Sequence, residues 1–346
     1  MRALTLLHRW LAVPLAPLFA MWFASGIVMH VVPYPALSET ERTAGLAPIE
    51  IARVTHGSRD AAAASALADA TRVALLQRPD GPVHVVTGKG RLVALHADDL
   101  TPADVRTADL ALAIAVAHAR HRGLDAARAT LVDSLNHDQW TVAGDLNRHR
   151  PLWRVALHDG AGTELYVSSA TGEVVRDTTR RERGWGYAGS VAHWLYPVAL
   201  RAHPRAWIVT VWVVSGLASI AAIAGLALGV AMLVARRGLS STGRWHAWHH
   251  ALGLLCAAVV LAWIVTGWLS VDDGLVLPPS KLYGALHALD FPALTARPAL
   301  RTALVIGLCA CGLAFSLTGC VIAWRRMRSW IGSKFTSPRR SPTCPP

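Results

Sequence analysis

Four long apolar segments constrain this chain most strongly. They cover residues 10–32, 206–235, 247–270 and 300–324, and each has about the length that an α-helix needs to cross a bilayer. Of the 346 residues, 53% are hydrophobic and only 16% are charged, which is typical of membrane proteins. Backbone groups in lipid must be hydrogen-bonded within the protein, so such segments are expected to be helical. The sequence therefore predicts a bundle of four transmembrane helices.

The first apolar segment begins like a secretory signal peptide, because Arg2 and Arg9 precede it. Its apolar stretch continues to about Val32, whereas the hydrophobic region of a signal peptide has about 7–15 residues. We therefore interpret the segment as an uncleaved membrane anchor.

The positive charge of the chain is concentrated in three stretches. The formal net charge is +12, and residues 1–9, 236–246 and 325–346 contain basic residues but no acidic ones. These basic residues are Arg2, Arg9, Arg236, Arg237, Arg244, Arg325, Arg326, Arg328, Lys334, Arg339 and Arg340. Because cytoplasmic loops are enriched in Lys and Arg, both termini are predicted to be cytoplasmic, with 33–205 and 271–299 outside the cytoplasm. The charge thus encodes topology and indicates no nucleic-acid partner.

The segment between the first two spans has the composition of a soluble α+β domain. Residues 72–95 and 151–175 alternate apolar and polar side chains around turn signals, which predicts strands and hairpins. A helix is predicted over 107–123, ending at a glycine. This repetition suggests two small α+β units, at about 44–104 and 105–180. Neither unit contains a cysteine, so no disulfide framework is expected there.

The predicted helix and the strands after it resemble a PepSY domain. The Thr171-Gly172-Glu173 turn typical of that family is intact, although Ser169 stands where the family has an aspartate. The flanking segments resemble the PepSY-associated transmembrane proteins, through "LHRW" at 7–10, "RERGWGYAGSVAHWLYP" at 181–197 and "RWHAWHHALGL" at 244–254. The resemblance implies a bacterial inner-membrane protein associated with iron and siderophore uptake. It also implies two possible activities, since some relatives are thought to reduce ferric siderophores and PepSY domains have been proposed to restrain peptidases.

The membrane segments also resemble one another. Residues 8–26 align without a gap to 249–267, and residues 193–204 align to 287–298. The matched pairs include His8 and His249, Trp22 and Trp263, Ser25 and Thr266, Gly26 and Gly267, His193 and His287, Leu195 and Leu289, Pro204 and Pro298, and Gly225 and Gly319. The second helix pair is therefore interpreted as a copy of the first, with the α+β domain inserted into the first copy.

Two parallel repeats imply a pseudo-two-fold axis along the membrane normal. Across that axis His8 would face His249 near the cytoplasmic surface, and His193 would face His287 near the external surface. Facing histidines at each end of an apolar helix bundle predict the axial ligands of two b-type haems. The chain contains no Cys-x-x-Cys-His motif, so covalent attachment of haem is not expected.

Other histidines remain as alternatives. A histidine at a membrane interface can hydrogen-bond to headgroups or loop carbonyls and bind no metal. The second-choice haem ligands are His30, which lies at the depth of the external pair, and His250 and His246, near the start of the third span. In the inserted domain, His118 and His121 share one helical face and form a weaker metal-site candidate.

The predicted fold class is a membrane protein: a four-transmembrane-helix bundle of two parallel helix-pair repeats, with an inserted periplasmic α+β PepSY-like domain. The segments are helix one at 1–32, the periplasmic domain at 33–192, the external connector and helix two at 193–235, the cytoplasmic loop and helix three at 236–270, the external loop and helix four at 271–324, and a basic cytoplasmic tail at 325–346.

The function expected from these features is that of a di-haem b electron-transfer protein, which passes electrons to periplasmic ferric siderophores or other ferric chelates. Hard oxygen chelators suit Fe(III) better than Fe(II), so one electron loosens the complex. No flavin or nicotinamide fingerprint is seen, which leaves a quinol or another protein as the electron donor. The alternative is a membrane-tethered PepSY module that regulates a peptidase or another partner and has no redox role. Transport is disfavoured because no acidic residue lies inside a predicted span.

Overall fold

The computed structural model describes residues 1–235, 243–271, 278 and 280–335. Three stretches lie outside the described residues: residues 236–242 of the predicted cytoplasmic loop, most of 272–279, and the tail after 335.

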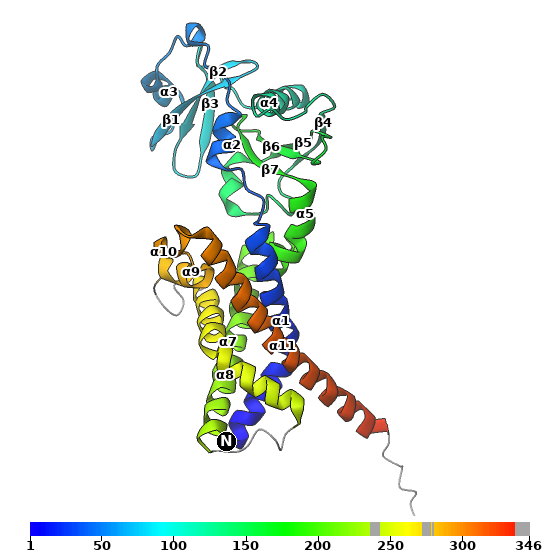
Figure 1. Ribbon diagram of the computed structural model, residues 1–346. Helices are drawn as coiled ribbons and strands as arrows, with labels where there is room; N and C mark the ends of the chain where they lie inside the picture. The colour runs from blue at the N-terminus through cyan, green and yellow to red at the C-terminus, as the bar shows by residue number, and fades with distance from the viewer. Residues whose placement is uncertain (236–242, 272–277, 279, 336–346) are drawn as a thin grey trace, which may run out of the picture. The chain divides into compact units, whose positions relative to one another are not determined.

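Four of the described helices are long and apolar enough to cross a membrane (Figure 1). They are α1 (Arg2–Val31), α7 (Pro204–Val234), α8 (Arg244–Ser270) and α11 (Pro298–Phe335). Each covers all or nearly all of one predicted segment, so the prediction of four potential spanning helices is confirmed. The first helix begins earlier than predicted, because its basic N-terminal residues are already helical.

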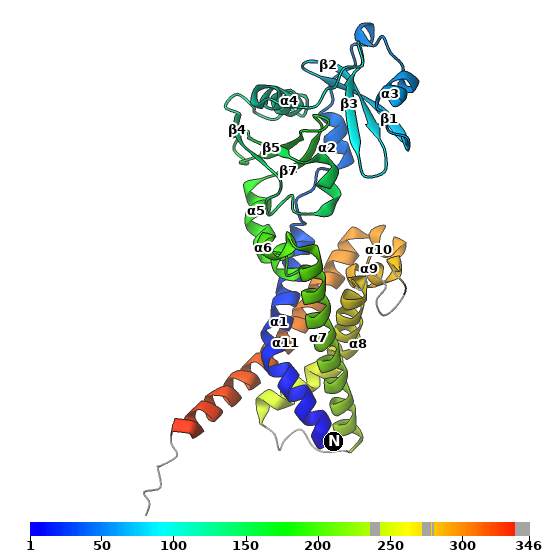
Figure 2. The same ribbon diagram turned by 180° about the vertical axis from the view of Figure 1, so that it is seen from behind.

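The four helices pack so that equivalent helices of the two copies lie at opposite corners. Helix α1 packs against α7 and α11, and α8 packs against the same two helices (Figures 1 and 2). The core between them contains Phe23, Cys256, Val260, Val305 and Cys309. Cys256 of α8 and Cys309 of α11 are therefore packing residues of this helix interface.

Short elements precede the second long helix of each copy. In the first copy, the π-helical turn η3 (Tyr187–Val191) leads toward α7. In the second copy, α9 (Lys281–Ala288) and α10 (Pro292–Thr295) lead to α11. Each connection carries one of the matched histidines.

The chain divides into two compact units, and the second unit comprises residues 32–187 and 197–202. Its first sheet has the antiparallel order β1-β2-β3, with β1 (Arg72–Arg78), β2 (Gly81–Thr87) and β3 (Leu92–His96). Three short helices precede this sheet: α2 (Glu39–Ala44), η1 (Ile51–Arg53) and α3 (Ser58–Ala64). The predicted Asp80-Gly81 turn joins β1 to β2, and Gly81 there has a φ of 132°, which favours glycine.

The second sheet has the antiparallel order β4-β5-β6-β7 and packs against α4 (Ala108–His121). Its strands are β4 (Thr130–Leu135), β5 (Leu152–Ala156), β6 (Glu164–Ser168) and β7 (Val174–Thr178), with η2 (Gly144–His149) between β4 and β5. The helix and the last three strands occur where the sequence predicts them. Strand β4 was not anticipated. Helices α5 (Arg180–Gly186) and α6 (Val198–Arg201) complete the described elements.

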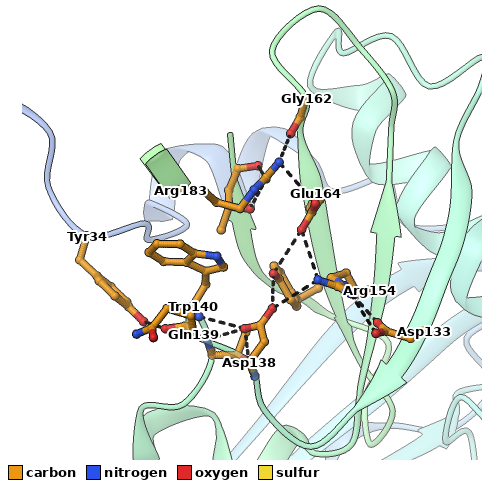
Figure 3. Close-up of polar contacts among 12 residues, drawn as sticks. Tyr34, Asp133, Asp138, Gln139, Trp140, Arg154, Gly162, Glu164 and Arg183 are labelled. Carbon is orange, nitrogen blue, oxygen red and sulfur yellow. Dashed lines mark hydrogen bonds and ion pairs between the residues drawn. The ribbon is translucent and has the colours of Figure 1, made fainter. Parts of the chain in front are cut away.

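A network of ion pairs ties the strands of the second sheet together (Figure 3). The Arg154 guanidinium lies 2.9 Å from the Asp133 carboxylate and 3.8 Å from those of Asp138 and Glu164. The buried Tyr166 hydroxyl donates to Asp138 over 2.7 Å, and burial raises the pKa of this phenol far above its usual value. These partly buried charges are thus paired, which limits their desolvation cost.

Candidate functional site

His193 and His287 face each other at the end of the bundle where α1 and α8 finish and α7 and α11 begin. Their ring centroids are 5.9 Å apart, and the ring planes are inclined by 57°. Bonds between imidazole nitrogens and metals are about 2 Å long, so two rings on opposite sides of one metal have centroids roughly 6 Å apart. The spacing therefore fits two axial ligands of one iron. We call this pair site B.

The hydrogen bonds of site B fix which ring nitrogen carries the proton. Nδ1 of His193 lies 3.1 Å from the carbonyl oxygen of Trp22, and Nδ1 of His287 lies 2.9 Å from that of Trp263. The Ser25 hydroxyl also lies 3.1 Å from Nδ1 of His193, and it donates its own proton to the Trp22 carbonyl oxygen. A carbonyl oxygen only accepts, so both Nδ1 atoms must donate a proton. Each neutral ring then has its lone pair on Nε2, the arrangement found in metal-ligating histidines. Trp22 and Trp263 are themselves a matched pair of the repeat.

The environment of site B keeps both imidazoles neutral. Burial, together with the nearby His287 ring, lowers the pKa of His193 to about 4. Burial also lowers the pKa of His287. Metal ligation requires the unprotonated ring, so no proton has to be removed from His193 at neutral pH.

The backbone after each site B histidine makes the same turn. Leu195, two residues after His193, has a φ of 49°, and Leu289, two residues after His287, has a φ of 51°. Non-glycine residues adopt this left-handed conformation rarely and at a cost in free energy. Its occurrence at two matched positions indicates that both connections bend to meet one geometric requirement.

A further pair of side chains holds the peptide after each histidine. Nε1 of Trp207 donates to the carbonyl oxygen of Trp194 over 3.0 Å. In the second copy, Nη2 of Arg301 donates to the carbonyl oxygen of Ala288 over 3.0 Å. Trp207 and Arg301 occupy equivalent positions, counted from their histidines. The copies thus share a hydrogen bond that different side chains supply.

Glycines allow the site B rings to lie directly against a helix backbone. A Cβ atom at Gly26 would lie 3.6 Å from the His193 ring, and one at Gly267 would lie 2.9 Å from the His287 ring. These glycines are a matched pair, one in α1 and one in α8.

His8 and His249 form a second pair, site A, at the other end of the bundle. Nδ1 of His8 lies 2.9 Å from the carbonyl oxygen of Ala221, and Nδ1 of His249 lies 2.9 Å from Oγ1 of Thr318. The Thr318 hydroxyl donates its own proton to the Phe315 carbonyl oxygen, so it must accept from His249. Both Nε2 atoms therefore carry lone pairs, as in site B.

Site A repeats the contact between imidazole and glycine. A Cβ at Gly225 would lie 2.6 Å from the His8 ring, and one at Gly319 would lie 3.4 Å from the His249 ring. The Phe315 ring stacks on the His249 ring, with centroids 4.7 Å apart and an interplanar angle of 19°. All four matched histidines thus lie against the four matched glycines.

The second-choice histidines differ in their hydrogen bonds. Nε2 of His30 is bonded to Oγ1 of Thr302 over 3.0 Å. Nε2 of His250 donates to the carbonyl oxygen of Gly229 over 3.1 Å, which uses the nitrogen that a haem ligand needs. His246 is exposed to the surroundings of the bundle. The structure therefore distinguishes these three from the matched four.

The inserted unit contains a pocket of about 380 Å³, lined among others by Arg78, His118, His121 and Glu173. His118 is buried, and its Nε2 has no hydrogen-bond partner within the described ranges. Burial lowers the pKa of His118 to about 4. His121 is exposed, and no group of three or more His, Cys, Asp or Glu side chains among the described residues is placed to hold a metal ion.

Sequence reasoning missed the residues that support the histidines. Leu195 and Leu289 were aligned, but their left-handed conformation leaves no trace in the sequence. Trp207 and Arg301 were missed because their side chains differ, although their spacing from the histidines was a usable signal.

No protein-family model matches the chain, and neither a curated protein nor a solved structure matches it. The function is therefore argued from the geometry of sites A and B.

Proposed function

We propose that the helix bundle holds two b-type haems, one between His8 and His249 and one between His193 and His287. The observation that carries this proposal is the shared hydrogen-bond pattern of the four imidazoles. Each donates Nδ1–H to an acceptor within the bundle, which leaves Nε2 with a free lone pair. Four such rings at the two ends of an apolar bundle, with His193 and His287 facing each other, are suited to ligation.

When bound, a haem supplies one-electron chemistry at each site. The residues of the chain hold and orient the group. The carbonyl oxygens of Trp22 and Trp263 fix the site B rings, and burial keeps those rings neutral and shields them from water. The glycines provide the close approach of ring and helix that a larger side chain would prevent.

In this proposal the protein lies in a bacterial inner membrane. Both termini are then cytoplasmic, and the inserted PepSY-like unit is periplasmic. The acid-free basic segments support this orientation through the positive-inside rule. Site A then lies near the cytoplasm and site B near the periplasm. Electrons enter from a quinol or a protein donor and leave to a ferric siderophore or another ferric chelate. The chelate releases iron more readily once the metal is Fe(II).

The absorption spectrum of the purified protein tests haem binding directly. Two bis-histidine haems give a sharp Soret band and a reduced α-band, with two haems per chain by pyridine haemochrome assay. A protein expressed with sufficient haem that shows no Soret band would contradict the proposal. The membrane-tethered module that regulates a peptidase would then be the better interpretation.

Electron delivery is tested by rapid mixing. The protein is reduced with dithionite, freed of excess reductant and mixed with a ferric siderophore, and haem reoxidation is followed by absorbance. The gallium(III) complex of the same siderophore is the matched control, because gallium(III) is not reduced under these conditions. A wild-type protein that binds haem but stays reduced with every ferric chelate would refute the ferric-reductase activity and leave haem binding intact.

A further inference from the structure

Among the described residues, Arg301 is the one charged residue whose side chain hydrogen-bonds to the backbone next to a proposed haem ligand. Its Nη2 donates to the carbonyl oxygen of Ala288 over 3.0 Å, and its Nε donates to that of Leu289 over 3.1 Å. These carbonyls directly follow His287. In the other copy, the neutral indole of Trp207 makes the equivalent bond to Trp194. The supporting hydrogen bond therefore does not require a charge, and the charge of Arg301 calls for a separate explanation.

The ion pairs among the described residues do not include Arg301. Its Nη1 makes no hydrogen bond to a described residue. Its sequence neighbour Thr302 is bonded to His30. A half-buried guanidinium at the end of an apolar bundle is costly unless an anion compensates it.

Building on the function proposed above, we infer that Arg301 binds a carboxylate at site B and raises the reduction potential of the iron held there. A b-type haem carries two propionate carboxylates on one edge of the porphyrin. A guanidinium is a planar fork that matches a carboxylate with two parallel hydrogen bonds. Because two backbone bonds next to His287 fix the position of Arg301, its free Nη1 is held close to the ligand and available to such a group.

The same charge acts on the electron. Reduction of the site B iron adds one negative charge, and a positive charge fixed nearby favours the reduced state. The partial burial of both rings and of Arg301 makes this interaction stronger than it would be in water. Arg301 thereby makes site B a better electron acceptor than it would be with a neutral residue at that position.

The chain itself suggests the decisive variant. Arg301→Trp places in the second copy the residue that the first copy uses, so the indole can donate to the Ala288 carbonyl while the charge is lost. Arg301→Lys keeps the charge without the fork, and Trp207→Phe removes the equivalent backbone bond without a change of charge. Each is prepared with His8→Ala, so that only the site B haem is titrated. Redox titration without any chelate, and haem transfer to apomyoglobin, are the readouts.

We expect Arg301→Trp to lower the site B midpoint potential and to release haem several-fold faster. Arg301→Lys should retain most of the increase in potential, and Trp207→Phe should shift the potential less than Arg301→Trp does. An unchanged potential and release rate in Arg301→Trp would overturn the inference and show that Arg301 supports only the backbone. The folding of each variant is checked by circular dichroism and gel filtration. If Arg301→Trp misfolds, Arg301→Gln replaces it in the comparison.

A ferric chelate with carboxylate arms is the other possible source of the same anion. In that case Arg301→Trp would leave the potential and the haem release unchanged. It would weaken the binding of ferric citrate but not that of a carboxylate-free hydroxamate chelate. This result would show that the carboxylate belongs to the acceptor, and it would overturn the porphyrin assignment. A wild-type protein without haem is a separate result, because it refutes the proposed function itself.

Discussion

The two copies of the helix pair surround their histidines with the same backbone interactions but with different side chains. In both copies a site B imidazole donates to the carbonyl oxygen of a matched tryptophan, and a leucine in left-handed conformation follows two residues later. In both copies a glycine lies against each ring. These features act through backbone atoms or through the absence of a side chain.

The differences between the copies lie in the supporting side chains. Trp207 of the first copy corresponds to Arg301 of the second. Ala221, whose carbonyl oxygen accepts from His8, corresponds to Phe315, whose ring stacks on His249. A carbonyl acceptor is present whatever residue stands at a position, so the side chains can change while the imidazole keeps its tautomer. The comparison therefore identifies the histidines and glycines as the invariant requirement of both sites.

The comparison assumes that the two helix-pair copies have the same orientation in the membrane, and topology reporters can test this assumption. A reporter active only in the periplasm should be active when fused after Gly172 and silent when fused after Gly238, because the acid-free basic segments keep the starts of both copies in the cytoplasm. A reporter active only in the cytoplasm provides the complementary control. The reverse pattern would invert every assignment of sites A and B to a face of the membrane.

Replacement of the matched histidines should have the next largest effect. His193→Ala and His287→Ala should each remove the site B haem, and His8→Ala and His249→Ala the site A haem, leaving one of the two proposed haems per chain by pyridine haemochrome assay. The loss follows because each iron would keep a single protein ligand.

The controls for this prediction are His30→Ala and His250→Ala. Their Nε2 atoms are already hydrogen-bonded within the bundle, so both variants should retain two haems. Full haem content in His249→Ala, combined with loss in His250→Ala, would show that the repeat assigns the wrong ligand to site A.

The spans, the inserted domain and the repeat could be predicted from sequence because each leaves a strong periodic or compositional signal. Apolar length predicts the four long helices, and the glycine-containing turns predict the hairpins β1-β2 and β6-β7. The alignment of His193 with His287 anticipated two rings that the structure places 5.9 Å apart. Such signals arise from residues close in sequence or repeated at fixed spacing.

The interactions that distinguish ligands from other histidines could not be predicted. The bond of Nδ1 in His193 to the Trp22 carbonyl links positions far apart in the chain and involves a backbone atom, which has no sequence signature. The same holds for the bond of His250 to the Gly229 carbonyl, which argues against His250 as a ligand. Which nitrogen is free is a property of the folded packing, so sequence reasoning left His250 and His30 as alternatives.

Glycine substitutions sharpen the comparison at the level of packing. Gly225→Ala would place a Cβ 2.6 Å from the His8 ring, whereas the matched Gly319→Ala would place it 3.4 Å from the His249 ring. Overpacking costs about 1–3 kcal/mol, while glycine to alanine in a helix otherwise gains about 0.5–1 kcal/mol. We therefore expect Gly225→Ala to lower the thermal midpoint of the purified protein and to displace the haem, and Gly319→Ala to be nearly neutral.

The site B glycines offer an independent check of the same argument. Gly267→Ala, with a Cβ 2.9 Å from His287, should be harmful, and Gly26→Ala, at 3.6 Å from His193, should be tolerated. Equal effects of both substitutions in each matched pair would show that the ring contacts adjust freely, and the glycines would lose their assigned role.

The smallest expected effect concerns the left-handed leucines. Leu195 has a φ of 49°, a conformation that costs an L-residue roughly 1–2 kcal/mol and a β-branched residue more. Leu195→Gly should therefore be more stable than Leu195→Val by about 1–2 kcal/mol in thermal unfolding, with the haem spectrum unchanged in the glycine variant. The matched position separates strain from packing, because Leu289 packs against the bundle core. Leu289→Gly relieves the same strain but loses that contact, so its stability should fall below that of the wild type. If the glycine and valine variants at Leu195 are equally stable, the turn after His193 does not need a left-handed residue, and the backbone match between the copies has no energetic basis.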